Sequence, residues 1–485
     1  MAMAKDQSNT ETDISVKLSS SIADVDSTYH RYHIETAMTA DMSDLPNRFL
    51  VEVSRINLLK LIIKESRDYF GKWDVILNRP CVYGVFSGPI GGFAPRPNHC
   101  VGCLRCTIQH PDVVTIKHNP EWQSWGDTYL SPKLVDTILT EASTGAVPVK
   151  GQGYRGRFGG PGWDRIWTDM SEILRPTRDG IHGREFISTV TDIGSKPMHL
   201  SFNSKGKIIS DKPSTLSTQL PILFDSPPQT VRNSKLVRVL SKAAQEIESL
   251  VFLPIKNIFD CNLSGGHIVP QVNSSEVDLI QKLKFSLKLV EALDIGAAKS
   301  LSKQNLRICL RVDLDNGWED LIQKAFDIGI RVFHMVADYH GRGDEHFIRD
   351  LIIKTHKNLV RKGIRDQVTL IGSGGIAAAE HVPKAIICGF DAVAIDTPVL
   401  AAIQAQPQGE CISSEHSNFI LPKSFTVSWG VQRLKNLCAA WRDQLLEIMG
   451  AMGIREVRRM RGELGRAMFQ KDLEKEAFGG IDGYE

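Results

Sequence analysis

The sequence has no long apolar run and no strong excess of charge of either sign. Its most apolar early stretch, residues 56–63, contains Lys60 and is far shorter than the ~20 residues of a membrane-spanning helix. Residues 1–43 are polar and lack the apolar segment of a signal peptide. The 58 Lys and Arg residues nearly balance 56 Asp and Glu residues, which disfavours nucleic acid as the main partner. We therefore expect a soluble cytoplasmic protein without a membrane anchor, whose residues 1–44 form a flexible tail.

The nine cysteines do not have the pattern of a disulfide framework, so we expect a reducing compartment. Three of them, Cys100, Cys103 and Cys106, follow the strict spacing C-x2-C-x2-C. Thiolates at this spacing can turn toward one point and supply most of the ligands of an iron-sulfur cluster. The other six are scattered singly: Cys81, Cys261, Cys309, Cys388, Cys411 and Cys438.

The fourth ligand of this cluster is not evident from the motif. Bacterial ferredoxins continue with C-x3-C-P, whereas this chain has His110 before Pro111. Three arrangements stay open: a 3Fe-4S cluster on three thiolates, a 4Fe-4S cluster completed by His110, or one completed by a remote cysteine such as Cys81. Zinc is the minority alternative, because no second ligand pair at knuckle spacing is present. We predict a small ferredoxin-like iron-sulfur module over residues 45–130.

Local patterns predict three elements around this module. Apolar residues at three- and four-residue steps predict a helix over residues 45–70, residues 112–117 can form a short strand, and residues 131–142 a helix that begins with Ser131 and Pro132. Residues 131–215 form a connector. Within it, residues 151–156 match the dinucleotide fingerprint G-x-G-x-x-G, but the glycines and proline at 159–162 prevent the helix that the fingerprint requires. Reducing power should therefore arrive through the cluster from a partner protein.

From Leu220 onward, short apolar runs alternate with helical stretches such as residues 276–290 and 346–361. Continuous apolar strands separated by helices indicate a parallel sheet that is buried on both faces. We predict an α/β fold with a (β/α)8 TIM-like barrel over residues 216–410, followed by C-terminal helices over residues 411–485 that pack on it. The seven candidate strands are residues 221–224, 249–253, 255–260, 307–312, 331–336, 367–371 and 392–395.

Two turns of small and polar residues follow the last two predicted strands. Near the end of a TIM barrel, such turns offer backbone N-H groups and a helix N-terminus to a phosphate. We predict that they bind a phosphorylated ligand such as flavin mononucleotide (FMN). The predicted binding residues are Gly372, Ser373, Gly374, Gly375, Asp396 and Thr397.

The cysteine motif, residues 159–189, residues 336–343 and the phosphate region 372–397 together resemble the FMN-binding glutamate synthase family, in its archaeal type. The resemblance covers roughly residues 81–485. It implies a barrel that binds FMN and receives electrons from an iron-sulfur centre, with ferredoxin or another protein as donor. In glutamate synthases the flavin reduces 2-iminoglutarate, formed from 2-oxoglutarate and ammonia, to glutamate.

The chain departs from the family pattern in several places. The family has a Gly-x-Lys-Pro-Gly turn whose lysine lies near flavin and substrate, whereas residues 264–271 contain no lysine. The family's cluster cysteines follow the last barrel strand, where this chain has only Cys411 and Cys438. The chain begins with Met1, not with the cysteine nucleophile of a glutaminase, so we expect ammonia from outside or from a separate glutaminase subunit. The alternatives are a flavoenzyme that acts on another substrate and an electron-relay subunit that has lost its flavin. The oligomeric state stays open.

Three residues near strand ends are the catalytic candidates. His340 would act as acid or substrate-orienting group, since the C-terminal end of a barrel carries the chemistry, although a structural histidine is equally expected. Arg311 would place a cation in the barrel mouth for flavin N1 or a substrate carboxylate, unless it pairs with Asp313 or Asp315. Asp338 is the third candidate, with a helix N-cap as its alternative role.

Overall fold

The computed structural model describes residues 32–72, 81–147, 160–169, 187–197, 200–210, 213–304 and 306–481. The chain divides into two compact units, Met1–Glu35 and Thr36–Glu485, and everything below concerns the second. The predicted tail up to residue 31, the glycine pattern at 151–156 and most of the segment 159–189 lie outside the described residues. Among the described helices, none is both long and apolar enough to cross a bilayer.

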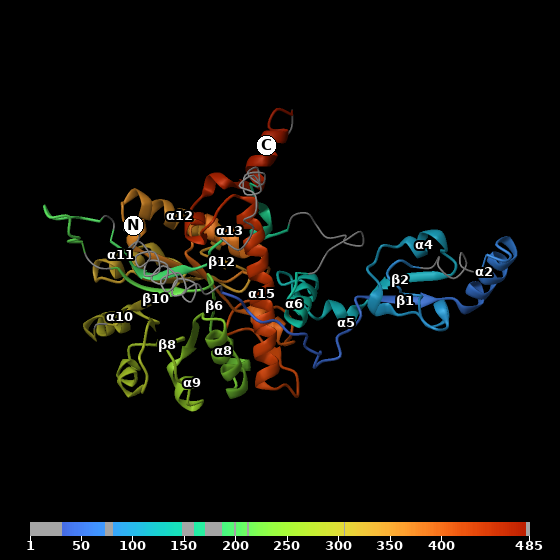
Figure 1. Cartoon of the computed structure of the whole chain (residues 1–485), viewed down its shortest axis with the longest axis horizontal. Helices are drawn as coiled ribbons and strands as arrows, with labels where there is room; N and C mark the ends of the chain where they lie inside the picture. Colours follow the sequence, from blue (N-terminus) through green and yellow to red (C-terminus); the bar gives the residue numbers. More distant parts are fainter. Residues whose placement is uncertain are drawn as a thin grey trace, which may run out of the picture. The chain divides into compact units, whose positions relative to one another are not determined.

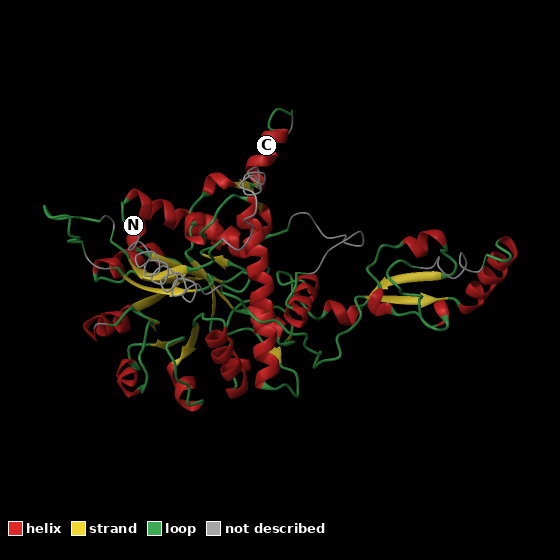
Figure 2. Ribbon diagram, in the orientation of Figure 1, coloured by secondary structure: helices red, strands yellow, loops and turns green. Residues whose placement is uncertain are grey.

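Eight parallel strands close into a barrel, in the order β10-β11-β14-β15-β6-β7-β8-β9 (Figures 1 and 2). The strands are almost continuously buried, as expected where helices cover the outside and side chains fill the inside. This arrangement confirms the predicted TIM-like barrel. The strands are β6 (Ile222–Phe224), β7 (Val251–Pro254), β8 (Ile268–Val272), β9 (Val290–Ala292), β10 (Ile308–Asp313), β11 (Val332–Val336), β14 (Thr369–Ser373) and β15 (Ala392–Ile395).

Six of the seven predicted strands are confirmed, and one is wrong. Residues 255–260 form the helix α9 (Ile255–Asp260), which directly follows β7. A short apolar run has no periodicity that separates a strand from a buried helical turn. Strands β8 and β9 were not predicted, because Pro270 and Gln271 interrupt the first and the second has only three residues. The predicted helix over 276–290 is also wrong, since that segment holds a 3-10 turn, η6 (Val277–Lys282), and the start of β9.

Helices surround the barrel, and the long C-terminal helix α15 (Val427–Ala451) packs against α6, α8 and α14. Arg433 in α15 is fully buried and donates to the backbone carbonyls of Ala402 and Leu139, which joins α15 to α14 and α6. Apolar side chains of this helix, Leu434 and Trp441 among them, are buried, as expected for a C-terminal helix that packs on the barrel. The other helices are α6 (Pro132–Thr144), α8 (Ser234–Glu246), α10 (Ile295–Leu301), α11 (Trp318–Asp327), α12 (Ile348–Arg361), α13 (His381–Cys388), α14 (Thr397–Ala402) and α16 (Gln470–Phe478).

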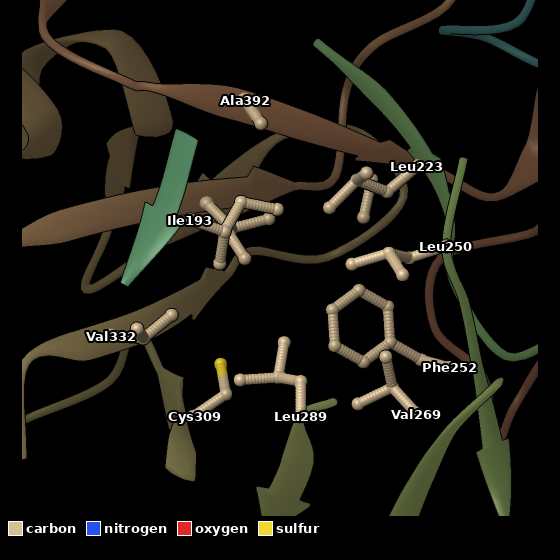
Figure 3. Close-up of a cluster of buried hydrophobic side chains, with 11 residues drawn as sticks. Ile193, Leu223, Leu250, Phe252, Val269, Leu289, Cys309, Val332 and Ala392 are labelled. Atoms are coloured by element: carbon tan, nitrogen blue, oxygen red, sulfur yellow. The ribbon is translucent and has the colours of Figure 1, made fainter. Parts of the chain in front are cut away.

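A hairpin that precedes the barrel fills the barrel's N-terminal end. Strands β4 (Thr191–Ser195) and β5 (Ser214–Thr218) pair in antiparallel register, and Gly194 exchanges hydrogen bonds with the Thr369 hydroxyl at the start of β14. Ile193 is fully buried among side chains from the barrel strands, including Leu223, Phe252 and Cys309 (Figure 3). Because this end is packed with apolar side chains, the opposite end is where a ligand can enter.

The cysteine region forms a small element group of its own. Strand β1 (Phe49–Val53) pairs with β2 (Val114–His118) in antiparallel register, which confirms the predicted strand at 112–117. The predicted helix over 45–70 is correct only in its second part, α2 (Arg55–Asp68), because its first part is β1. The remaining short elements are α4 (Arg105–Gln109), α5 (Pro120–Gln123), β3 (Ile166–Thr168), β12 (Arg342–Gly343), β13 (His346–Phe347), β16 (Gln406–Pro407), β17 (Phe419–Ile420) and β18 (Ala467–Phe469).

Candidate functional site

A cavity of about 590 Å³ opens at the C-terminal ends of the barrel strands. Its lining comes from almost every part of the rim, with Asp225 after β6, Gln271 in β8, Arg311 in β10 and Asp396 before α14. This end of a barrel is where enzymes of this fold place their reacting groups. Three of the predicted site residues, Arg311, Asp338 and Asp396, line the cavity. The others, His340, Gly372, Ser373, Gly374, Gly375 and Thr397, are not part of its lining.

Arg311 projects from β10 into the mouth, where about a fifth of its side chain is exposed. Its guanidinium binds Asp225 through two nitrogens, with Nη1 to Oδ1 at 3.1 Å and Nη2 to Oδ2 at 3.3 Å. The expected partner Asp313 is farther away, at 3.9 Å from Nε. Burial by itself would raise the pKa of Asp225, but Arg311 and then His334 outweigh it and lower that pKa. The mouth therefore has a fixed cation whose main partner is a buried carboxylate.

A buried polar network lies next to Arg311 inside the barrel. His334 in β11 contacts Glu291 Oε1 through Nδ1 at 2.5 Å and Ser373 Oγ through Nε2 at 2.6 Å. Glu291 Oε2 accepts from Gln271 Nε2 at 2.7 Å and lies 3.8 Å from Arg311 Nη1. Glu291, His334 and Ser373 have no exposed surface. Glu291 and His334 were not among the predicted site residues, although a charged or polar residue inside an otherwise apolar strand is a signal visible in the sequence.

The glycine turn after β14 packs tightly against the loop after β11. Gly374 and Gly375 have φ of +96° and +69°, a region that glycine adopts without strain. A Cβ on Gly375 would lie 2.7 Å from the Cα of Gly341, so the backbones approach too closely for a side chain. Tyr129 covers the turn from the other side, and its hydroxyl donates to the Gly375 carbonyl at 2.7 Å. Close packing of backbones therefore accounts for these glycines.

The start of α14 has few free donors for a phosphate. The Thr397 N-H donates to the carboxylate of Asp396 at 2.5 Å, Pro398 has no N-H, and the Val399 N-H donates to the Asp396 carbonyl at 3.1 Å. Burial, with the charge of Asp225 nearby, raises the pKa of Asp396 to about 7. The cavity has space and a cation for a flavin ring. The start of α14, however, offers few free N-H donors to the phosphate of FMN.

His340 lies in the loop after β11 but outside the cavity lining. Its Nε2 is 3.2 Å from Asp127 Oδ2 and 3.8 Å from Glu410 Oε2, and its ring stacks on Tyr129 at 5.6 Å between centroids. Asp127 also accepts the N-H groups of Tyr129 and Leu130, at 2.8 and 2.6 Å. These contacts join the segment before α6 to the barrel rim, which is a structural arrangement. The catalytic role of His340 stays a prediction.

Asp338 lies in the same loop and faces the cavity. Its Oδ1 accepts the backbone N-H of Arg342 at 2.7 Å, so its side chain stabilises a turn and does not cap a helix. Burial raises the pKa of Asp338 more than its hydrogen bonds and His340 lower it. A carboxyl group with a raised pKa at the mouth can hold a proton near neutral pH more easily than an exposed one.

Three of the predicted metal ligands lie near the paired strands β1 and β2. Cys81, Cys100 and Cys106 pack against an apolar cluster that includes Phe86 and Val114. Burial raises the pKa of the Cys100 thiol, and Cys106, Cys81 and Cys103 raise it further when they are ionised. Cys100 and Cys106 are therefore each within electrostatic reach of Cys103 and Cys81, and the role of Cys81 as a ligand stays a prediction.

The spacing of these groups bears on the kind of metal site. Four thiolates on one zinc ion lie about 3.8 Å apart, because each Zn-S bond is about 2.3 Å long. Among the described cysteines and His110, no three ligand atoms lie within 4.8 Å of one another. The backbone N-H of His110 donates to the carbonyl of Cys106 at 2.9 Å, which continues the turn of α4. A cluster of several metal atoms on these cysteines stays a prediction.

Comparisons with known proteins identify relatives of this chain. A family model described as a conserved region in glutamate synthase matches residues 348–455. An archaeal-type glutamate synthase (NADPH) of Dehalococcoides mccartyi is 22% identical over 436 residues, which cover 76% of this chain and 86% of the relative. An archaeal glutamate synthase (NADPH) of Archaeoglobus fulgidus is 22% identical over 460 residues, covering 78% and 88%. A Thermotoga neapolitana relative is 34% identical over 114 residues, 22% of each chain.

Solved structures with some similarity include the flavin-binding domain of flavocytochrome b2 from baker's yeast. It has a TM-score of 0.40 and 13% identity, and the match covers 75% of this chain and 84% of that one. A mandelate oxidase structure has a TM-score of 0.37 and 16% identity, covering 61% and 98%. The assignment of a TIM-like barrel rests on the strand pairing of this chain itself.

Proposed function

Because this chain is related to the FMN-binding glutamate synthase family, we propose that it is a cytoplasmic oxidoreductase enzyme of the glutamate synthase type. Electrons from a donor protein such as ferredoxin enter through an iron-sulfur cluster on Cys100, Cys103 and Cys106. At the barrel mouth, 2-iminoglutarate is reduced to glutamate, with ammonia supplied from outside or by a separate glutaminase or amidotransferase subunit. The observation that carries this proposal is similarity to two glutamate synthases over more than three quarters of the chain.

The residues of the mouth support a reaction on a carboxylate substrate. Arg311 is held in place by Asp225, and its partly exposed guanidinium can bind a carboxylate of 2-oxoglutarate. Asp338 faces the same cavity with a raised pKa and can supply a proton to a developing amine. FMN, when bound, supplies hydride transfer. The barrel occupies residues 216–410 in this proposal, the iron-sulfur module 45–130, the connector 131–215, the C-terminal helices 411–485 and the tail 1–44.

A second candidate keeps the barrel without a flavin, as an electron-relay or scaffold subunit. It is favoured by one observation, the engagement of the α14 donors by Asp396 together with Pro398. A third candidate is a flavoenzyme with another substrate, which is favoured by the seven carboxylates that line the cavity against three arginines. The carboxylates are Asp225, Asp313, Asp315, Asp338, Asp344, Asp396 and Glu415, and the arginines are Arg232, Arg311 and Arg342.

Two measurements on the purified full-length chain separate these candidates. Flavin, iron and acid-labile sulfide are quantified after denaturation, and a preparation with iron and sulfide but no flavin would reject both flavoenzyme candidates. Glutamate formation from 2-oxoglutarate and ammonia is then assayed with reduced ferredoxin, with NADPH and with an artificial reductant. Failure with all three donors, in protein that contains flavin and cluster, would reject glutamate as the product.

A further inference from the structure

The hydrogen bonds of Ser373 and His334 determine where one buried hydrogen must be. The Ser373 hydroxyl donates its single hydrogen to the carbonyl of Ala394, at 3.0 Å. The hydrogen between Ser373 Oγ and His334 Nε2, 2.6 Å apart, must therefore belong to the imidazole. This direction also separates the group from a Ser-His-Glu hydrolase triad, whose histidine accepts the serine proton. Ser373 is not a nucleophile here.

The contact between His334 and Glu291 requires a second hydrogen. Nδ1 and Oε1 are 2.5 Å apart in a fully buried position, and two bare lone pairs would repel each other at that distance. A hydrogen therefore lies between them, on the imidazole or on the carboxyl group. Since Nε2 already carries a hydrogen, the pair holds one proton more than a neutral histidine with an ionised glutamate.

This additional proton balances the charge around Arg311. Glu291 Oε2 is 3.8 Å from Arg311 Nη1, and the same guanidinium binds Asp225. Without the proton, two buried carboxylates would face one guanidinium and leave a net charge of minus one. Asp396, close to Asp225, adds a partial negative charge, because its pKa of about 7 leaves it only partly ionised near neutral pH. An uncompensated negative charge in a poorly solvated site would weaken binding of an anion at the mouth.

We propose that Glu291 and His334 share a buried proton that keeps Arg311 available as a binding cation for a carboxylate ligand at the barrel mouth. Both are positioning residues, because they act through Arg311 and do not line the cavity. The proposal rests on the proposed function for its ligand, a dicarboxylate such as 2-oxoglutarate. It assigns a role to Glu291, a charged residue of the barrel that has no exposed surface.

The first test looks for the proton itself. In protein labelled with 15N-histidine, a far-downfield 1H resonance coupled to an imidazole nitrogen is expected in the wild-type chain. It should disappear in both His334→Gln and Glu291→Gln. A wild-type spectrum without this resonance would overturn the shared proton, whatever the chain binds.

The second test uses the opposite charges of the two residues. Titration calorimetry with 2-oxoglutarate should show about tenfold weaker binding to His334→Gln, which leaves Glu291 uncompensated. Glu291→Gln should bind 2-oxoglutarate within about twofold of the wild type. This variant removes the negative charge of Glu291, so no additional proton is required to balance it. The double variant should recover the affinity that His334→Gln loses.

A purely structural role predicts a different pattern, in which each substitution weakens binding and the double variant is worst. That pattern would overturn the proposal. If His334→Gln does not fold, Glu291→Gln, the double variant and the spectrum still decide. A wild-type chain that shows the resonance but does not bind 2-oxoglutarate would overturn the proposed substrate and the role of Arg311, and not the shared proton.

Discussion

Asp391 offers a sharp test of what holds the barrel to its C-terminal segment. It precedes β15, and its carboxylate binds Arg365 Nη2 at 2.9 Å, Arg461 Nη1 at 3.1 Å and the Leu370 N-H at 2.8 Å. Asp391→Asn would leave the buried guanidinium of Arg365 without its counter-charge. Loss of one partner of a buried ion pair costs about 3–5 kcal/mol, so the free energy of unfolding should fall by that amount in urea titrations at pH 7.

Asp366→Asn is the matched control, since Asp366 binds the other end of Arg461 at 2.6 Å. Its side chain is 66% exposed, against 10% for Asp391, and exposed pairs contribute about 0–1 kcal/mol. Equal losses in the two variants, or a loss below about 1 kcal/mol in Asp391→Asn, would refute the reasoning.

The free energies of unfolding of the wild type and of Asp391→Asn should also depend differently on pH. Burial would raise the pKa of Asp391, but Arg365 and Arg461 outweigh it and lower that pKa. The stability that this carboxylate contributes is therefore fully present above its unfolded pKa of about 3.9 and is lost as pH falls through the lower folded value. The difference between the wild type and Asp391→Asn should shrink below about pH 4, and a difference that stays constant there would contradict the assignment.

Three further predictions concern the cluster and the mouth. Cys100→Ala should remove iron, sulfide and turnover together, whereas Cys438→Ala, buried in α15, should keep all three. If the Cys81 thiol is the fourth ligand, Cys81→Ala should lower the iron content and His110→Ala should not. The reverse result would assign the fourth position to the His110 imidazole. Arg311→Lys should raise KM for 2-oxoglutarate about tenfold, because lysine lacks the bidentate geometry, while Arg307→Lys at the opposite strand end should not.

The sequence was sufficient for the barrel where strands are continuous apolar runs. Ala392–Ile395 and Val332–Val336 are examples, since burial on both faces selects an unbroken run. Strand prediction failed where a proline or a charged residue interrupts the apolar run, as Pro270 does in β8 and Glu291 does in β9. The helix at Ile255–Asp260 shows the opposite error, because a segment of six residues, three of them apolar, fits either structure.

The site was predictable only one residue at a time. Arg311 could be assigned to the mouth from its position on a strand, but its partner Asp225 is 86 residues away and only barrel closure brings them together. The network of Glu291, His334 and Ser373 joins three strands for the same reason. The role of Asp396 depends on which way its carboxylate turns, and a motif carries no information about that rotamer.

The hairpin that fills the barrel's base limits how this chain can be shortened. A fragment that begins at residue 216 would cut through β5 and lose Ile193, which leaves Leu223, Phe252 and Cys309 facing water. A fragment that ends at residue 410 would also lose α15, whose Arg433 binds carbonyls of α14 and α6. The smallest piece that could fold and stay dispersed therefore extends well beyond the eight strands in both directions, so the barrel is not a transferable module.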